Sequence, residues 1–161
     1  MADDHLKTLV AQGLQALKAG GEVAKRATSE IQNDAGDPEL KQLLETGNQT
    51  AQQWQQRVQR ALDEAGPAPA GEQGNPVLEA HYEVSRRIRQ QAPDARTRDL
   101  GIIAAGQLAL HYWIASFGTL RTYAAATGAS ETEQAMQRSL DEAKAADQQH
   151  TDAAQRLLRA S

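Results

Sequence analysis

Hydrophobic residues recur every three or four positions along most of this chain, which is the spacing of side chains that share one face of a helix. Near the N-terminus this spacing is kept by Leu6, Leu9, Val10, Leu14 and Leu17. Interruptions in the pattern separate five predicted helices, at about residues 4–33, 37–65, 75–91, 94–127 and 130–158. Because no alternating run of β-branched residues accompanies them, the pattern predicts an all-α protein.

Residues typical of turns stand at the interruptions. Asp37-Pro38-Glu39 predicts a helix start, because an Asp side chain can cap the first turn and Pro fits at its first position. Asn75-Pro76 opens the short third helix, and residues 66–71 form a Pro- and Ala-rich linker too short to separate domains. Gly20-Gly21 lies inside the first helix, where each Gly costs about 1 kcal/mol. We therefore expect a kink or a close contact with another helix at that point.

The lengths of these segments predict the fold. Four long helices of about 28–34 residues, joined mostly by tight turns, are the elements of a helical bundle. We expect a four-helix bundle with an additional short helix between the second and third long helices. The whole chain, residues 1–161, fits a single domain.

Composition narrows the functions that such a bundle can have. The formal net charge is -4, so we expect no binding to nucleic acid or to an anionic membrane. Cysteine is absent, which excludes disulfides, thiolate catalysis and Cys-ligated metal sites. No stretch reaches the ~18 apolar residues of a membrane span, and the N-terminus lacks a signal-peptide pattern. We therefore expect a cytoplasmic protein, and we find no motif that predicts a catalytic residue or an organic cofactor.

Residues 99–123 carry the most specific motif in the chain. Within them Gln107 precedes His111-Tyr112, and Gly118-Thr119-Leu120 follows. This stretch resembles the YciE/YciF-type family of ferritin-like bacterial proteins, in which a Gln precedes Glu-His-Tyr-Glu and then Tyr-Gly-Thr-Leu. Residues 37–41 and the pair Glu142 and Asp147 are similar to that family's second and last helices. The resemblance implies that the predicted bundle is ferritin-like.

The resemblance also implies a di-metal carboxylate site at the bundle centre, built from inward-facing acids and histidines. Glu142 and Asp147 remain on the last helix of this chain, but the other matching positions have changed. The family's Glu of the first helix, His and Glu of the second, two acids of the third and one Glu of the last correspond here to Gly13, Gly47, Thr50, Leu110, Trp113 and Ala143. Loss of acids from three helices removes negative charge that two buried metal ions require.

We therefore favour a non-enzymatic ferritin-like bundle protein that binds neither metal nor cofactor and acts by interaction. The resemblance implies a homodimer and a role connected with stress, while the sequence identifies no other protein partner. An alternative is a metalloprotein with a remodelled iron, manganese or zinc site built from His111, Glu142, Asp147 and His150. A third hypothesis is a pocket for a small ligand at the centre, where Gly13 and Gly47 leave space unless Trp113 fills it.

We expect structural roles for the other conspicuous residues. Trp54 and Trp113 are expected to pack in the core or at a dimer contact. His81 lies between Glu79 and Glu83 but on the other side of the helix, so we expect these three residues at the surface. The local basic patch is expected to pair with acids of neighbouring helices or of a second subunit, with binding of an anion or phosphate as the alternative, and it consists of Arg86, Arg87, Arg89, Arg96 and Arg98.

Overall fold

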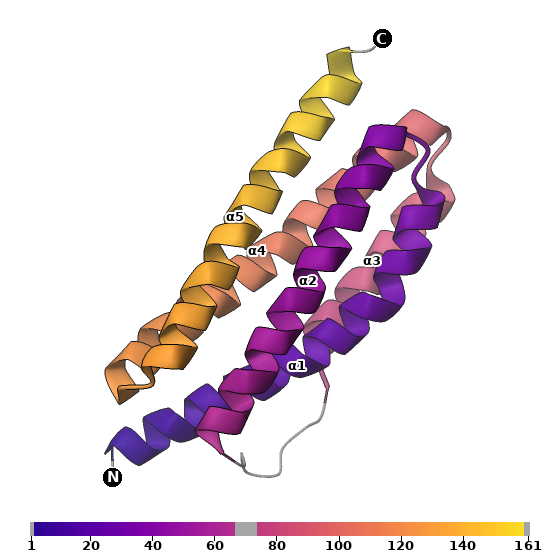
Figure 1. The fold of residues 1–161 in the computed structure, drawn as a ribbon. Helices are drawn as coiled ribbons and strands as arrows, with labels where there is room; N and C mark the ends of the chain where they lie inside the picture. Colours follow the sequence, from indigo (N-terminus) through magenta and orange to yellow (C-terminus); the bar gives the residue numbers. More distant parts are fainter. Residues whose placement is uncertain (1, 67–73, 160–161) are drawn as a thin grey trace.

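The computed structural model describes residues 2–66 and 74–159, and these residues form five helices (Figure 1). The four long helices are α1 (Ala2–Asp34), α2 (Pro38–Ala65), α4 (Ala95–Thr127) and α5 (Ser130–Arg159). The short helix α3 (Pro76–Gln91) lies between α2 and α4 in the chain. The predicted all-α architecture and its additional short helix are therefore confirmed.

Because the short helix α3 separates α2 from α4, these two long helices run in the same direction. Figure 1 shows α1 and α5 running upward, and α2 and α4 running downward. After α2 the chain returns to the top of the bundle along α3, which packs against α1 and α4. Consequently α2 and α4 run in the same direction, while α1 with α2 and α4 with α5 form antiparallel pairs.

Side-chain caps fix the helix starts that the sequence predicts. Asp37 accepts a hydrogen bond from the amide of Leu40 at 2.8 Å, and Asn75 accepts one from Leu78 at 3.1 Å. The turn between α1 and α2 is also tied to α4, because buried Asp99 accepts bonds from the amides of Gly36 and Asp37 at 2.8 and 2.9 Å.

Helix α1 continues through Gly20 and Gly21. A Cβ atom at Gly20 would lie 2.7 Å from Nδ2 of Asn75 and 3.1 Å from Cη2 of Trp113. A Cβ atom at Gly21 would lie 1.9 Å from the side chain of Gln55. The close contact that the sequence predicts here is confirmed, since both positions need glycine for other elements to approach.

The core is divided into two hydrophobic clusters along the bundle. One cluster includes the fully buried Leu14 and Phe117. The other includes Leu40 and Ile102 and joins the end of α1, the starts of α2 and α4, and the end of α5. Tyr82 of α3 packs against both clusters, so it marks the level at which they meet.

Helix α4 is the most apolar element. By length and composition it is the one helix in the described part of the chain that could cross a membrane, which corrects the expectation that no stretch qualifies. A central helix of a bundle has the same composition, and α4 packs against α1, α3 and α5. Within its most apolar stretch of 18 residues, 33% are buried inside the bundle.

Candidate functional site

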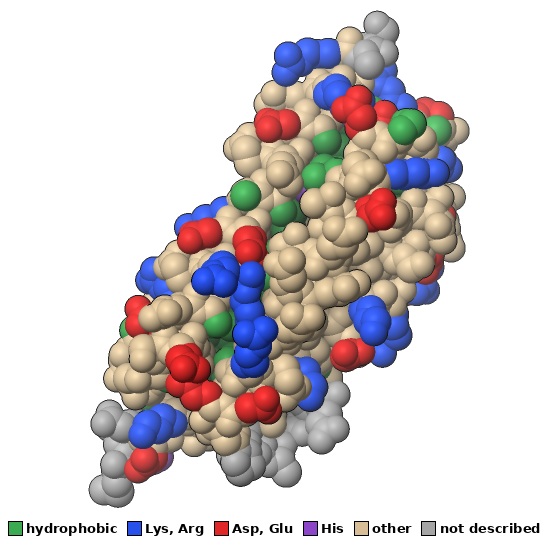
Figure 2. Space-filling view, in the orientation of Figure 1, with side chains coloured by type: hydrophobic (Ala, Val, Ile, Leu, Met, Phe, Trp, Pro, Cys, Tyr) green, Lys and Arg blue, Asp and Glu red, His purple; other side chains and the backbone are tan. Residues whose placement is uncertain are grey.

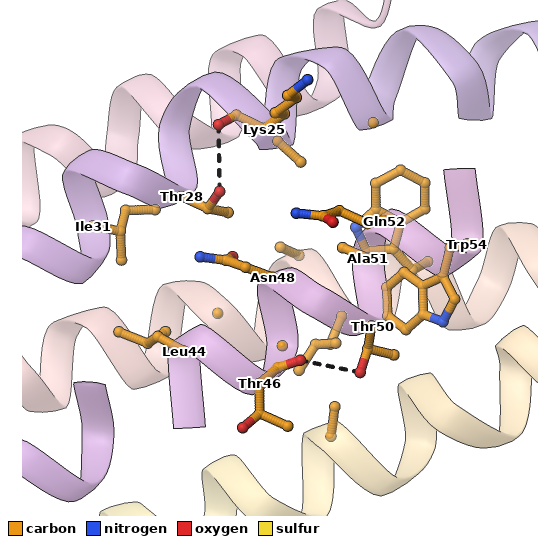
Figure 3. A pocket seen from close by; sticks show the side chains of 18 of the residues that line it. Lys25, Thr28, Ile31, Leu44, Thr46, Asn48, Thr50, Ala51, Gln52 and Trp54 are labelled. Carbon is orange, nitrogen blue, oxygen red and sulfur yellow. Dashed lines mark hydrogen bonds between the residues drawn. The ribbon is translucent and has the colours of Figure 1, made fainter. Parts of the chain in front are cut away.

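A cavity of about 670 Å³ lies at the level where the two core clusters meet. All five helices contribute to its wall, which includes Trp54 and Trp113 of the first cluster and Ile31 and Ile102 of the second. Figure 3 shows Thr28 and Lys25 of α1 facing Asn48 and Gln52 of α2 across the opening. The cavity therefore has an apolar interior and a polar rim.

Small residues create this space. A Cβ atom added at Gly47 of α2 would meet nothing within 4 Å. The wall also contains Ala51 of α2, Ala105 and Gly106 of α4, and Ala145 and Ala146 of α5. Because protein interiors are normally packed without large voids, a layer of small side chains from three helices is needed to keep such a volume open.

Two aromatic rings of the cavity wall, those of Trp54 and Trp113, pack against each other and against Phe117. The ring centroids of Trp54 and Trp113 lie 6.1 Å apart, and Phe117 lies 5.3 Å from Trp54 and 5.7 Å from Trp113. Both tryptophans are buried, with 5% of each residue's surface exposed. The predicted packing of Trp54 and Trp113 in the core is confirmed, and both rings also line the cavity.

The carboxylate of Glu142 is held by neighbouring donors on α2. Arg57 donates two hydrogen bonds to it, from Nη1 to Oε2 at 2.5 Å and from Nη2 to Oε1 at 2.9 Å. The indole nitrogen of Trp54 donates a third bond at 2.8 Å. Hydrogen bonds from Arg57 hold the pKa of Glu142 below its ordinary value, against the opposite effect of burial, and Trp54 lowers the pKa further.

His150 lies on the same wall, with 7% of its surface exposed. Its Nδ1 lies 2.8 Å from the carbonyl oxygen of Ala146, which can only accept, so Nδ1 carries the hydrogen. Burial lowers the pKa of His150 and favours the neutral ring, whose Nε2 is then a hydrogen-bond acceptor. Gly106 makes room for this ring, because a Cβ atom there would lie 2.9 Å from Nε2.

His81 and Tyr82 of α3 also line the cavity. The expectation that His81 lies at the surface is wrong, because its Nε2 is buried and has no hydrogen-bond partner. Burial lowers the pKa of His81, partly opposed by the backbone of Ala105, and burial raises the pKa of Tyr82 to about 12. Both rings are therefore neutral at pH 7. Glu83 does lie at the surface, as predicted, and pairs with Arg86.

The four residues of the alternative metal site are divided between two sides of the bundle. His111 is exposed and its Nε2 lies 3.3 Å from Oδ2 of Asp147. Glu142 and His150 instead line the cavity. Within residues 2–66 and 74–159 no group of three or more His, Asp or Glu side chains is arranged to hold a metal ion. The residues present therefore do not fit a di-metal centre.

Several positions at which the resemblance implied metal ligands nevertheless converge on one place. Gly47, Thr50, Leu110, Trp113 and Glu142 all line the cavity. Gly13 does not, since a Cβ atom there would lie 2.6 Å from Leu120 in the packed core. The expectation that Gly13 leaves open space is therefore wrong, whereas Gly47 does leave such space and Trp113 does not fill it.

In the predicted basic patch, Arg86 and Arg89 pair with acids, whereas Arg96 bonds to the carbonyl oxygen of Leu158. Arg89 is buried and bonds to Glu30 and Asp34, both at 2.8 Å. Arg86 pairs with Glu30 as well as with Glu83.

Arg57, which holds the carboxylate of Glu142, is a residue of the site that the sequence did not predict. Its one local signal is its position three residues after Trp54, on the same helix face.

These features define the protein as an all-α bundle of four long helices and a short one, with a cavity at its centre. Residues 5–161 match the sequence profile of the family described as a domain of unknown function (DUF892). The chain belongs to this family. The family relationship inferred from residues 99–123 is confirmed.

Two known proteins show how far the similarity extends. The chain is 35% identical over 78 residues to protein YciF of Escherichia coli (strain K12), which covers 48% of this chain and 47% of that relative. It thus spans about half the length of the curated relative that it matches. The crystal structure of the E. coli stress protein YciF has a TM-score of 0.91 at 21% identity, covering 97% of this chain and 98% of that one. YcfI from Rhodopseudomonas palustris has a TM-score of 0.83 at 23% identity, covering 89% and 90%. At these identities the two structures establish the fold alone.

Proposed function

We propose that this chain is a non-enzymatic ferritin-like bundle protein in which an Arg57–Glu142–Trp54 network and a cavity replace a di-metal centre. One observation carries this proposal. Both oxygens of Glu142, the acid at a matching ligand position, accept hydrogen bonds from Arg57. The guanidinium supplies positive charge that a metal would otherwise supply, and it does so without further carboxylates.

The composition of the cavity wall supports the same conclusion. Two divalent ions need several anionic oxygen ligands at close range. The carboxylates on the described wall are Glu22 and Glu142, and Glu22 is exposed on α1. Leu110 and Trp113 contribute apolar surface at two further positions. The wall, as far as the structure describes it, therefore lacks the charge that would offset the desolvation of two ions.

We further propose that the chain forms a homodimer through the outer face of α4. Between Asp99 and Arg121 this helix contains no Asp, Glu, Lys or Arg, and its exposed positions include Ala104, Leu108, His111, Ala115 and Thr119. Leu108 is 67% exposed. In an antiparallel pair of α4 helices centred near His111, Leu108 of each protomer would meet Ala115 of the other, which is the self-complementary contact of a twofold axis.

A role in the stress response and a cytoplasmic location are extensions of the proposal. The E. coli relative YciF, whose fold this chain shares, is described as a stress protein. The expected result for this chain is recovery in the soluble cytoplasmic fraction of its host, in larger amounts after stress. Recovery in the membrane fraction, or an amount unchanged by every stress applied, would contradict this extension.

The central proposal is tested by elemental analysis of purified protein that has been incubated with iron, manganese and zinc and then desalted. We expect far less than one metal ion per chain. A content near one or two ions per chain, lost in the variant Glu142→Gln, would overturn the proposal, because binding would then require the carboxylate that we assign to Arg57.

A further inference from the structure

We infer that the central cavity is a binding site for an uncharged, largely aromatic small molecule that carries a hydrogen-bond donor. The location of this site rests on the proposed replacement of the metal centre. Its chemistry rests on the wall residues themselves.

The volume and position of the cavity favour a ligand over a packing defect. Pockets for small molecules usually occupy about 300–1,000 Å³, and a cavity of about 670 Å³ falls within that range. It lies between two well-packed clusters that contain fully buried residues such as Phe117 and Ile103. The bundle is therefore packed on both sides of the cavity, whose wall includes the small residues Gly47, Ala51 and Ala146.

The charge distribution selects an uncharged ligand. Glu142, the partly buried acid of the wall, is already paired with Arg57. The other charged wall residues, Glu22 and Lys25, are exposed on α1. Because His81 and His150 are neutral, no unpaired charge among the described interior residues could offset the cost of burying a charged ligand.

Two features of the wall select the shape and the polar group of the ligand. Trp54, Trp113 and Tyr82 contribute aromatic surface from three different helices, against which a flat ring system can stack or meet edge to face. His150 contributes an acceptor, because its hydrogen is on Nδ1 and engaged with Ala146. A ligand hydroxyl or N–H group can satisfy Nε2 of this ring.

The cavity can be reached from solvent along α2. Figure 2 shows hydrophobic side chains along a furrow between α2 and α5. The middle of α2 carries no large apolar residue between Gly47 and Gln53, and Figure 3 shows Asn48 and Gln52 facing α1 while Thr50 points away from it. A ligand could therefore enter beside α2 without separation of the two core clusters.

The test is a titration with N-phenyl-1-naphthylamine, an uncharged aromatic probe with one N–H donor. The chain contains two tryptophans, and both line the cavity, so their emission reports directly on occupancy. We expect saturable quenching of tryptophan emission by about one probe per chain, with a dissociation constant on the order of 10 μM. Quenching that does not saturate would overturn the inference.

A matched pair of variants locates the probe. Gly47→Leu places a side chain in open space on the wall and should weaken binding at least tenfold. Gln49→Leu adds a leucine two residues away at an exposed position outside the wall, and it should leave binding unchanged. Equal binding to native protein and to folded Gly47→Leu, checked by circular dichroism, would place the probe elsewhere and overturn the inference.

The need for a hydrogen-bond donor on the ligand is tested with 1-phenylnaphthalene, which lacks the N–H group of the amine. It should bind native protein several-fold more weakly than the amine, and the two probes should bind equally to His150→Leu. Equal binding to native protein would overturn the assigned role of His150. All titrations use chelator-treated protein, whereas the metal analysis uses metal-incubated protein. Absence of probe binding would therefore overturn the ligand site alone, and a high metal content would overturn the proposed loss of the metal centre.

Discussion

Arg57 of α2 holds both carboxylate oxygens of Glu142 on α5, at 2.5 and 2.9 Å, and Glu142 lines the central cavity. The two side chains are largely buried, with 14% and 30% of their surfaces exposed. A two-point contact of this kind fixes the orientation of the carboxylate as well as its charge. It also connects two helices that are far apart in the sequence, beside the core cluster that contains Val58 and Ala143.

Removal of Arg57 should destabilise the protein because it leaves a partly buried carboxylate with one remaining donor, Trp54. We expect Arg57→Leu to lower the free energy of unfolding by about 2 kcal/mol, measured by urea denaturation. The double variant Arg57→Leu with Glu142→Leu should lose less than the sum of the two single variants, since it leaves no unpaired charge. Strict additivity would show that the two side chains do not interact in solution.

The Arg57–Glu142 pair should stabilise the folded protein at neutral pH, and this stabilisation should be lost at acidic pH. The folded pKa of Glu142 is lowered mainly by Arg57, so the unfolded chain takes up a proton at higher pH than the folded protein does. The stabilisation is complete above the ordinary pKa of Glu142, 4.5, and is lost as the pH falls through the lower folded pKa.

This dependence is measured as the difference in unfolding free energy between native protein and Glu142→Gln. The difference should be largest near pH 7 and should shrink steadily below about pH 5. Other acids with lowered pKa values, such as Asp37 and Asp94, are present in both proteins and cancel in the comparison. A difference that stays constant down to pH 3 would contradict the assignment.

Two glycines should respond to the same substitution with opposite signs. Gly20→Ala brings a methyl group within 3.1 Å of Asn75, Leu78 and Trp113, so we expect a loss of about 1–3 kcal/mol. Gly47→Ala points into open space and gains helix propensity, so we expect stabilisation by about 0.5–1 kcal/mol. Thermal unfolding of both variants checks the pair, and destabilisation by Gly47→Ala would mean that the cavity is narrower than described.

The proposed dimer predicts the effect of a charge at the centre of the α4 face. Leu108→Glu should convert the dimer to a monomer, because it buries an unpaired carboxylate against the same helix of the partner. Leu9→Glu is the matched control, since Leu9 is also exposed but lies on α1. Sedimentation measurements distinguish the two masses. A native protein that sediments as a monomer, or a Leu108→Glu variant that remains dimeric, would contradict this interface.

The fold could be predicted because its signals are local. Asp-Pro and Asn-Pro pairs favour a helix start through short-range contacts, and the structure uses both Asp37 and Asn75 as caps. The burial of Trp54 and Trp113 also follows from helical periodicity. Such features depend on neighbours within one or two turns, which the sequence displays directly.

The site could be predicted only in part, because its contacts join distant segments. Arg57 and Glu142 are 85 residues apart, and no local pattern indicates that they meet. The position of His81 between two acids predicts a surface location, whereas the packing of α3 against α4 buries its Nε2. Gly47 and Gly13 both lie inside long helices, but the neighbours supplied by other helices decide that one faces a cavity and the other Leu120.

The most direct test of the central claim is the thermal unfolding of the native protein with and without an excess of iron, manganese or zinc. A ligand that binds the folded state raises its unfolding temperature by mass action. Because Arg57 and Trp54 already occupy the carboxylate of Glu142, we predict no shift with any of the three metals. A rise of several degrees that disappears in Glu142→Gln would show that the bundle centre still binds metal and would contradict the proposed replacement of the di-metal site.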